Sequence, residues 1–236
     1  GIQPPAFLPL RDSAADRKTA EALNEFIRQS LPILAKHTLN QDRRKRGLPL
    51  ANMILVRGAG QMGTYEPFSE RYGLSGSVIS AATLITGIGK SLGLRYVPVE
   101  GATGSSDTNL EGKVKAALTE LKEQDFVLLN IKGADEAGHD GHAIEKKNFI
   151  EHIDAALEPL LYTDECLIVI CADHSTPCSI RDHSADPVPL VIWGDDVRTD
   201  AVMQFDEVAC AQGGLNRITG HSLMPIICDL INRAKK

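Results

Sequence analysis

The chain has 236 residues, a formal net charge of −6, 43% hydrophobic residues and 24% charged residues. This balance is ordinary for a folded globular protein, and it excludes disordered, collagen-like and small-scaffold classes. The longest apolar run, residues 166–172, is far shorter than the roughly 20 residues that cross a bilayer, so we expect no membrane partner. No export leader opens the chain, which predicts a cytoplasmic protein, and the missing initial Met indicates a processed or trimmed piece.

Charge is unevenly distributed along the chain. Residues 1–50 hold nine Lys or Arg against five Asp or Glu, a balance of +4, whereas the remainder holds sixteen against twenty-six, a balance of −10. The basic excess is concentrated in residues 43–46, and only 5% of the chain is aromatic. A nucleic-acid surface would need further basic stripes or interleaved aromatic residues, so we expect no nucleic-acid partner. An acidic body suits metal cations better than polyanions.

Hydrophobic periodicity predicts a first helix over residues 14–31, with Ser13 as its N-cap and a disturbance at Pro32. A buried strand is predicted over residues 52–57, where it ends in a Gly-rich turn. From residue 77 onward, strands and helices alternate regularly. The strands are predicted at 77–82, 95–99, 126–131, 167–171 and 189–193, and the helices at 84–92, 111–123, 144–161 and 223–234.

Short apolar runs separated by amphipathic helices are typical of an α/β fold with a mostly parallel sheet and helices on both faces. A boundary is predicted at about residues 72–76, where the basic, loop-rich first part gives way to the regular alternation. The sequence therefore predicts two domains, residues 1–72 and residues 73–236.

A glycine motif at residues 58–63 matches the G-x-G-x-x-G pattern of dinucleotide sites and follows the strand predicted at 52–57. The pattern also needs a helix at its third glycine and an acidic residue about 20 positions later. Pro67 falls where the helix should run, and no Asp or Glu lies between residues 70 and 100. We therefore exclude a nicotinamide site. Arg57 remains as a candidate anion-binding residue, with a surface ion pair as the alternative.

Histidine and aspartate are concentrated in the second half of the chain, where five of the seven histidines lie between positions 139 and 183. Asp135 and His139 follow one predicted strand, Asp173 and His174 follow another, and His183 precedes the last strand. Ligands of an open α/β sheet bind beyond the carboxyl ends of its strands, so these side chains should converge on one edge.

Carboxylate and imidazole ligands without thiolate suit Mn²⁺, Zn²⁺ or Mg²⁺. Five ligands are more than one tetrahedral ion needs, so we predict two divalent ions. Two ions close together stabilise the attacking and leaving oxygens of an in-line displacement, which indicates phosphoryl transfer or hydrolysis. The remaining histidines are left outside the site, namely His37, His142, His152 and His221.

Three segments together resemble one family. Residues 133–141 (GADEAGHDG), 172–178 (ADHSTPC) and 183–189 (HSADPVP) are similar to the archaeal-type 2,3-bisphosphoglycerate-independent phosphoglycerate mutases, which belong to the alkaline phosphatase superfamily. Residues 49–60 and 100–108 also resemble segments of that family. The resemblance runs in order from about residue 14 to the end of the chain.

The resemblance implies an alkaline phosphatase-like metal core over residues 73–236, preceded by the end of an inserted, substrate-binding α/β domain over residues 1–72. Within the core it implies that one ion is held by Asp135, His139 and His183. The other ion is held with the help of Asp173 and His174.

The resemblance also implies a small phosphorylated substrate, gripped by Arg57 and by a lysine for which Lys90 is the candidate. The family reaction is an isomerisation in glycolysis and gluconeogenesis: a serine takes the phosphoryl group from 3-phosphoglycerate, and the group returns to the 2-hydroxyl of glycerate. The family's first metal-binding Asp and its nucleophilic Ser precede everything matched here. We therefore expect this chain to be the C-terminal portion of the enzyme and to be inactive alone.

Two alternatives remain open. The metal motifs also suit a phosphohydrolase or another phosphotransferase of the same superfamily, and the chain could be a non-catalytic fragment or a metal-binding module. An all-helical His-Asp phosphohydrolase, suggested by the His139-Asp140 pair and His174, conflicts with ligands placed at strand ends.

Overall fold

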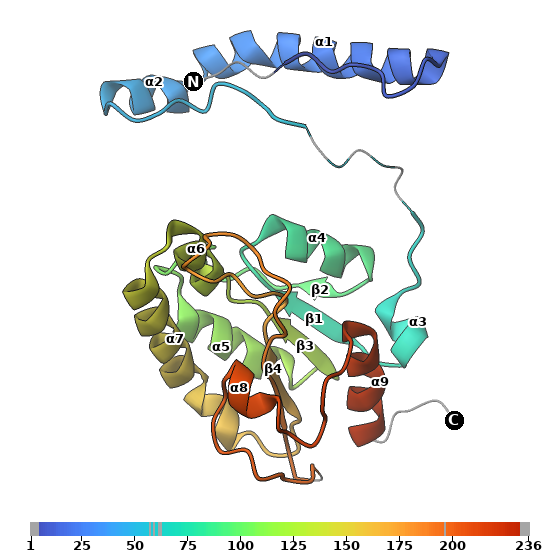
Figure 1. The fold of residues 1–236 in the computed structure, drawn as a ribbon, viewed down its shortest axis with the longest axis vertical. Coiled ribbons are helices and arrows are strands. Elements are labelled where there is room, and N and C mark those ends of the chain that lie inside the picture. The colour runs from blue at the N-terminus through green and yellow to red at the C-terminus, as the bar shows by residue number, and fades with distance from the viewer. Residues whose placement is uncertain (1–4, 57, 59, 61–62, 196, 232–236) are drawn as a thin grey trace. The chain divides into compact units, whose positions relative to one another are not determined.

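The computed structural model describes residues 5–56, 58, 60, 63–195 and 197–231 (Figure 1). These residues form two compact units that divide between Gly63 and Thr64. Phe68 packs with Leu74 and Val78 inside the second unit. The assignment of residues 1–72 to an inserted domain and 73–236 to a metal core stays a prediction.

The first unit contains the helices α1 (Ala14–Lys36) and α2 (Thr38–Lys45). As predicted, Ser13 caps α1, and its side chain accepts a hydrogen bond from the backbone N–H of Asp16 at 3.0 Å. The helix continues through Pro32, and the His37 side chain caps α2 by accepting from the Leu39 N–H. Residues 52–56 form no strand, so the strand predicted over residues 52–57 is wrong for this described part. A strand is stable only beside a hydrogen-bonded neighbour.

The second unit is built on the predicted parallel sheet. Strands β1 (Gly76–Ile79), β2 (Arg95–Tyr96) and β3 (Phe126–Leu129) pair in the order β2-β1-β3, and both pairings are parallel. Strands β4 (Ile168–Cys171) and β5 (Leu190–Trp193) form a separate antiparallel pair, whereas the sequence predicted one mostly parallel sheet. Parallel neighbours are usually joined by a crossover helix, and residues 172–189 between β4 and β5 contain none.

Helices flank these strands. Four of them agree broadly with the helices predicted at 84–92, 111–123, 144–161 and 223–234, whereas the helices over residues 68–72, 133–140 and 207–210 were not predicted. The helices are α3 (Phe68–Tyr72), α4 (Thr83–Ser91), α5 (Leu110–Glu120), α6 (Gly133–Asp140), α7 (Ala143–Leu157), the 3₁₀ helix η1 (Glu158–Tyr162), α8 (Glu207–Cys210) and α9 (Gly220–Leu230). Within the described residues, no helix combines the length and the apolar character needed to cross a membrane.

The central strand β1 is buried on both faces, which is why its sequence lacks polar alternation. Val78 faces a cluster formed with Phe68, Leu94 and Cys228, with Ile85 of α4 packed against it. Ser77 points to the opposite face, where its hydroxyl donates to Glu120 of α5. The predicted α/β class with helices on both faces is therefore confirmed, and Figure 1 shows α4 and α5 on opposite sides of the sheet.

Gly89 lets α4 approach β1 closely. A Cβ atom at Gly89 would lie 2.6 Å from Cγ1 and 3.0 Å from Cβ of Val78. The overpacking cost of about 1–3 kcal/mol exceeds the gain of about 1 kcal/mol in helix propensity.

We therefore expect Gly89→Ala to lower the free energy of unfolding, measured by urea denaturation with circular dichroism. Gly87→Ala is the matched control in the same helix, because its Cβ would meet nothing within 4 Å and the change should stabilise by up to about 1 kcal/mol. Equal effects of the two substitutions would contradict this view of the packing.

Candidate metal centre

Helix α6 carries two of the predicted metal ligands. It begins shortly after β3, and it is not among the predicted helices. Asp135 and His139 are four residues apart and therefore lie on the same helical face. Gly141 ends the helix in the left-handed conformation, with a φ of 76°.

Asn130 anchors the loop that leads from β3 into α6. Its backbone N–H donates to the carbonyl of Ile79 in β1 at 2.9 Å, and its side-chain oxygen accepts from the Ser80 hydroxyl at 2.7 Å. Its own carbonyl accepts from Nζ of Lys113 at 3.2 Å. Lys113 is only 1% exposed, and this burial lowers the pKa of its amino group. The start of α6 is thus tied to the central strand and to α5.

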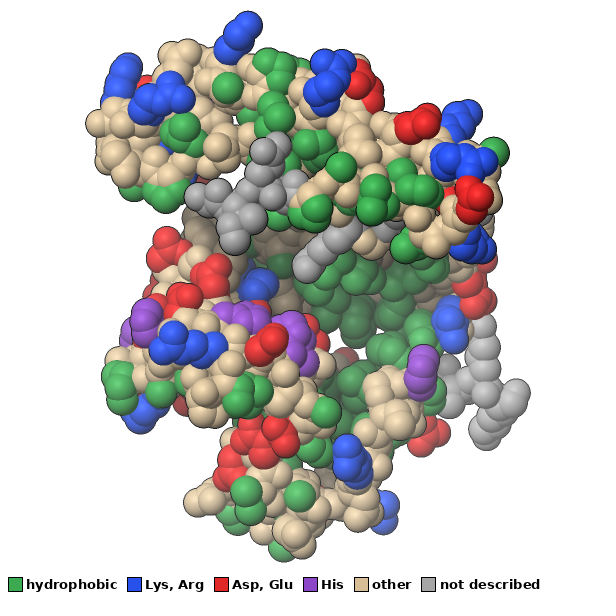
Figure 2. Space-filling model, turned by 45° about the horizontal axis from the view of Figure 1, so that its top comes forward, with side chains coloured by type: hydrophobic (Ala, Val, Ile, Leu, Met, Phe, Trp, Pro, Cys, Tyr) green, Lys and Arg blue, Asp and Glu red, His purple; other side chains and the backbone are tan. Residues whose placement is uncertain are grey.

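The loop between β4 and β5 supplies the other predicted ligands. Ser175 and Ser184 form an isolated antiparallel bridge, in which the Ser184 N–H donates to the Ser175 carbonyl at 3.0 Å. This bridge closes the loop and brings the rings of His174 and His183 to a centroid separation of 3.8 Å. Figure 2 shows His side chains gathered beside acidic side chains on the surface.

Three ligand atoms form a compact triangle. Nε2 of His139 lies 3.2 Å from Nε2 of His183 and 3.4 Å from Oδ1 of Asp135, and Nε2 of His183 lies 3.7 Å from the same oxygen. Ligands placed tetrahedrally at about 2.0–2.2 Å from an ion are separated by about 3.3–3.6 Å. The donor set and its spacing therefore fit one divalent cation.

The second predicted pair lies beside the triangle. Nε2 of His174 is 3.6 Å from Oδ2 of Asp173, whose side chain is 74% exposed. The other ring nitrogen of His174, Nδ1, lies 4.0 Å from Oδ1 of Asp135. Asp135, His174 and His183 also offer ligand atoms within 4.8 Å of one another. The geometry therefore permits His174 to be grouped either with Asp173 or with Asp135 and His183.

Asp135 is held as an ionised carboxylate. Burial by itself would raise its pKa, but the ammonium of Lys132 and the hydroxyl of Thr176, together with His139, outweigh burial and lower the pKa to about 2. Nζ of Lys132 lies 2.5 Å from Oδ2, and Oγ1 of Thr176 donates to Oδ1 at 2.6 Å. The two carboxylate oxygens thus have separate partners, and Oδ1 is the one that faces the imidazoles.

Lys132 and Thr176 are not among the predicted site residues. Each lies close to a predicted ligand in the sequence, Lys132 three residues before Asp135 and Thr176 two residues after His174. Neither residue type is a preferred metal ligand, so only their proximity to the motifs could have indicated them. Thr176 is 4% exposed, which would not be expected for a loop threonine without a partner.

The two predicted substrate residues are Arg57 and Lys90. Arg57 lies outside the described residues. Lys90 is in the last turn of α4, where its Nζ lies 4.8 Å from the centroid of the Tyr96 ring.

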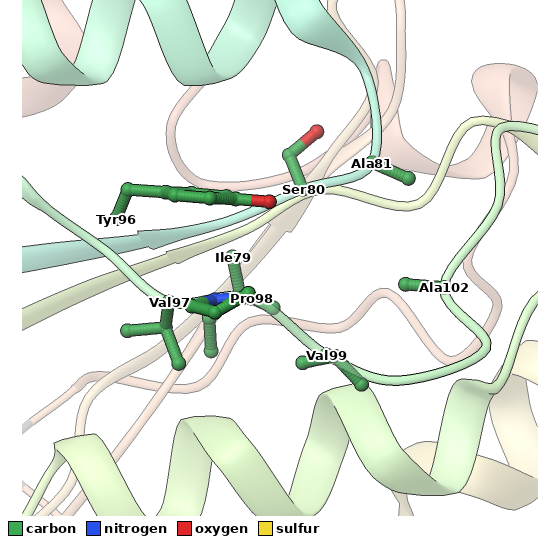
Figure 3. A pocket seen from close by; sticks show the side chains of 8 residues that line it. All are labelled: Ile79, Ser80, Ala81, Tyr96, Val97, Pro98, Val99 and Ala102. Atoms are coloured by element: carbon green, nitrogen blue, oxygen red, sulfur yellow. The ribbon is translucent and has the colours of Figure 1, made fainter.

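A pocket of about 60 Å³ lies at the ends of β1 and β2. Figure 3 shows its lining, which comes from Ile79 to Ala81, Tyr96 to Val99 and Ala102. This volume suits about two water molecules, whereas pockets for small organic ligands measure roughly 300–1,000 Å³. The pocket is therefore too small to serve as the substrate site.

Comparison with known proteins places the chain in a family. A sequence profile of the metalloenzyme superfamily matches residues 6–230, so the chain belongs to the metalloenzyme superfamily, whose membership implies divalent metal binding. The chain is 61% identical over its whole length to a 2,3-bisphosphoglycerate-independent phosphoglycerate mutase of Methanoculleus marisnigri and covers 57% of that protein. It is 47% identical to a protein of Methanocaldococcus jannaschii named 2,3-bisphosphoglycerate-independent phosphoglycerate mutase 1, of which it covers 58%.

Solved structures give the same result. A Pyrococcus horikoshii protein matches 94% of this chain with a TM-score of 0.85 and 41% identity, over 60% of its own length. A cofactor-independent phosphoglycerate mutase of Thermoplasma acidophilum matches 98% of this chain with a TM-score of 0.61 and 31% identity, over 56% of its length. These similarities confirm the resemblance that the motifs predicted. The chain spans a little over half the length of the curated relatives that it matches.

The lowered pKa of Asp135 makes acid stability testable in the metal-free chain. An aspartate whose pKa is about 2 in the fold and 3.8 otherwise stabilises the fold fully above about pH 4, and this contribution is lost as the pH falls toward about 2. We expect the difference in free energy of unfolding between the wild type and Asp135→Asn to be largest above about pH 4 and to shrink toward about pH 2.

Urea denaturation across this pH range measures the difference. Asp140→Asn removes an exposed carboxylate from the same helix and is the matched control, with no comparable loss expected. A difference between wild type and Asp135→Asn that stays constant with pH would contradict the ion pairing described for Asp135.

Proposed function

We propose that this chain forms the metal-binding part of a phosphoglycerate mutase that interconverts 3-phosphoglycerate and 2-phosphoglycerate. The observation that carries the proposal is the triangle formed by Asp135 Oδ1, His139 Nε2 and His183 Nε2, with separations of 3.2–3.7 Å. A relative named 2,3-bisphosphoglycerate-independent phosphoglycerate mutase, which is 61% identical over the full length of this chain, supports the proposal.

Two divalent ions, Mn²⁺, Zn²⁺ or Mg²⁺, are assigned to the site. Asp135, His139 and His183 hold one, and Asp173 with His174 helps to hold the other. The ions, when bound, neutralise negative charge on the transferring phosphoryl group and on the oxygens between which it moves. The chain's own residues orient these ligands: Lys132 occupies Oδ2 of Asp135, which leaves Oδ1 for the ion.

The reaction conserves the phosphoryl group. A serine hydroxyl attacks the phosphorus of 3-phosphoglycerate, so that a serine O–P bond forms as the bond to the 3-oxygen breaks, and the serine proton passes to that oxygen. The 2-hydroxyl of glycerate then attacks the phosphoserine, the serine O–P bond breaks, and the proton of the 2-hydroxyl returns to the serine oxygen. No residue of this chain is assigned as that serine. Arg57 and Lys90 are proposed to bind the anionic substrate, and the reaction is placed in cytoplasmic glycolysis and gluconeogenesis.

The two parts of the chain are assigned different tasks. Residues 1–72 are proposed to end an inserted substrate-binding domain, and residues 73–236 to form the later part of the metal core. The basic charge of the first 50 residues supports the first of these tasks. The two compact units divide between Gly63 and Thr64, so residues 64–72 lie in the second unit.

A chimera tests the proposed function. The part of the Methanoculleus marisnigri relative that this chain does not cover is joined to this chain in the relative's order. With Mn²⁺ present, we expect conversion of 3-phosphoglycerate to 2-phosphoglycerate, followed in a coupled assay, and no turnover by the 236-residue chain alone. His139→Ala and His183→Ala in the chimera should each lower kcat/KM by about 100-fold or more, because each removes an assigned metal ligand.

His152→Ala is the matched control, because this exposed histidine on α7 lies outside the cluster, and turnover should persist. Release of inorganic phosphate without formation of 2-phosphoglycerate would favour a phosphohydrolase instead. Full turnover of the His139→Ala and His183→Ala chimeras would contradict the metal assignment.

A further inference from the structure

Thr176 contacts both halves of the proposed metal centre. Its hydroxyl oxygen donates to Oδ1 of Asp135 at 2.6 Å and lies 3.1 Å from Nδ1 of His174. The residue is 4% exposed, so water does not compete freely for these contacts. Thr176 thus links a ligand assigned to the first ion with a ligand assigned to the second.

The hydrogen-bond balance at this hydroxyl determines the tautomer of His174. A threonine hydroxyl has one proton to donate, and an ionised carboxylate can only accept, so that proton is used in the bond to Asp135. The contact with His174 then requires a proton on Nδ1, which donates to the hydroxyl oxygen. Nε2 of His174 is left with its lone pair available for a metal ion.

This tautomer also determines whether His174 can share a metal ion with Asp135 or with Asp173. The nitrogen that lies 4.0 Å from Asp135 Oδ1 is Nδ1, which carries the proton and cannot bind a metal ion at the same time. The available nitrogen, Nε2, lies 3.6 Å from Oδ2 of Asp173. His139 is oriented in the same way, because its Nδ1 lies 3.2 Å from the Arg181 carbonyl, which can only accept.

Two helices hold the backbone of Thr176. Nζ of Lys146 in α7 donates to the Thr176 carbonyl at 2.8 Å. On the other side, a Cβ atom at Gly138 of α6 would lie 2.5 Å from the same carbonyl oxygen, so only glycine permits this approach. The position of the Thr176 hydroxyl is therefore fixed by elements outside its own loop.

We propose that Thr176 is a positioning residue of the metal centre: its hydroxyl orients the Asp135 carboxylate and fixes the Nδ1–H tautomer of His174, and Lys146 holds its backbone in place. The proposal rests on the proposed metal site. The tautomer, however, is set by contacts within the chain and can be measured without metal or substrate.

The first test is the tautomer of His174 in the metal-free chain, observed by long-range ¹H–¹⁵N NMR at about pH 8, where imidazole is mainly neutral. The wild type and Thr176→Ser should both show a protonated Nδ1 and a bare Nε2. Thr176→Val keeps the shape but offers no acceptor, so His174 should shift toward the Nε2–H form. Retention of the Nδ1–H form in Thr176→Val would overturn the proposal, whether or not the chain binds metal.

The second test is Mn²⁺ affinity, measured by titration of free Mn²⁺ with electron paramagnetic resonance. Thr176→Val and Lys146→Met should each bind Mn²⁺ about 10–100-fold more weakly, the usual loss when a partner of a metal ligand is removed. Thr176→Ser should bind like the wild type. Lys147→Met is the matched control, because Lys147 is exposed and pairs with Glu151 at 2.5 Å on α7.

If Thr176→Val does not fold, Lys146→Met and its control Lys147→Met test the proposal through the same two measurements, the His174 tautomer and the Mn²⁺ affinity. A weakened affinity and a shifted tautomer confined to Lys146→Met would support the proposal. Equal behaviour of the two lysine variants would overturn it.

Discussion

The carboxylate of Asp135 has two oxygens with different partners, and the arrangement around it follows from that division. Oδ2 is paired with Lys132, while Oδ1 accepts from Thr176 and faces the Nε2 atoms of His139 and His183. A half-buried carboxylate must be paired and hydrogen-bonded to remain ionised at low cost. These contacts keep Asp135 ionised and aim one of its oxygens at the imidazoles.

The fold brings these side chains together from three places in the sequence. Helix α6 follows β3 and lies at the carboxyl edge of the parallel sheet. The hydrogen bonds of Asn130 connect this junction to β1. The loop after β4 folds back through the Ser175–Ser184 bridge and lies against α6. The segments that follow β3 and β4 therefore supply the proposed ligands, and tertiary contacts set their spacing.

Much of this arrangement could be predicted from the sequence. The alternation of apolar runs and amphipathic helices predicted the parallel sheet, and the positions of Asp and His after the predicted strands indicated that these side chains meet. The antiparallel pairing of β4 and β5 was missed because periodicity describes a strand and not its neighbour. The strand predicted at 52–57 failed for a related reason, because a strand forms only where a partner exists. Lys132 and Thr176 could not be predicted, because their importance depends on contacts that the fold creates.

The most direct test of the central claim is an anomalous difference map from crystals of this chain soaked in Mn²⁺, with data collected near the manganese absorption edge. If Asp135, His139 and His183 hold the ion, a peak will lie within about 2.0–2.3 Å of Asp135 Oδ1 and of Nε2 of both histidines. A peak bound by Nδ1 of His174 in place of His139, or no peak beside Asp135, would contradict the claim.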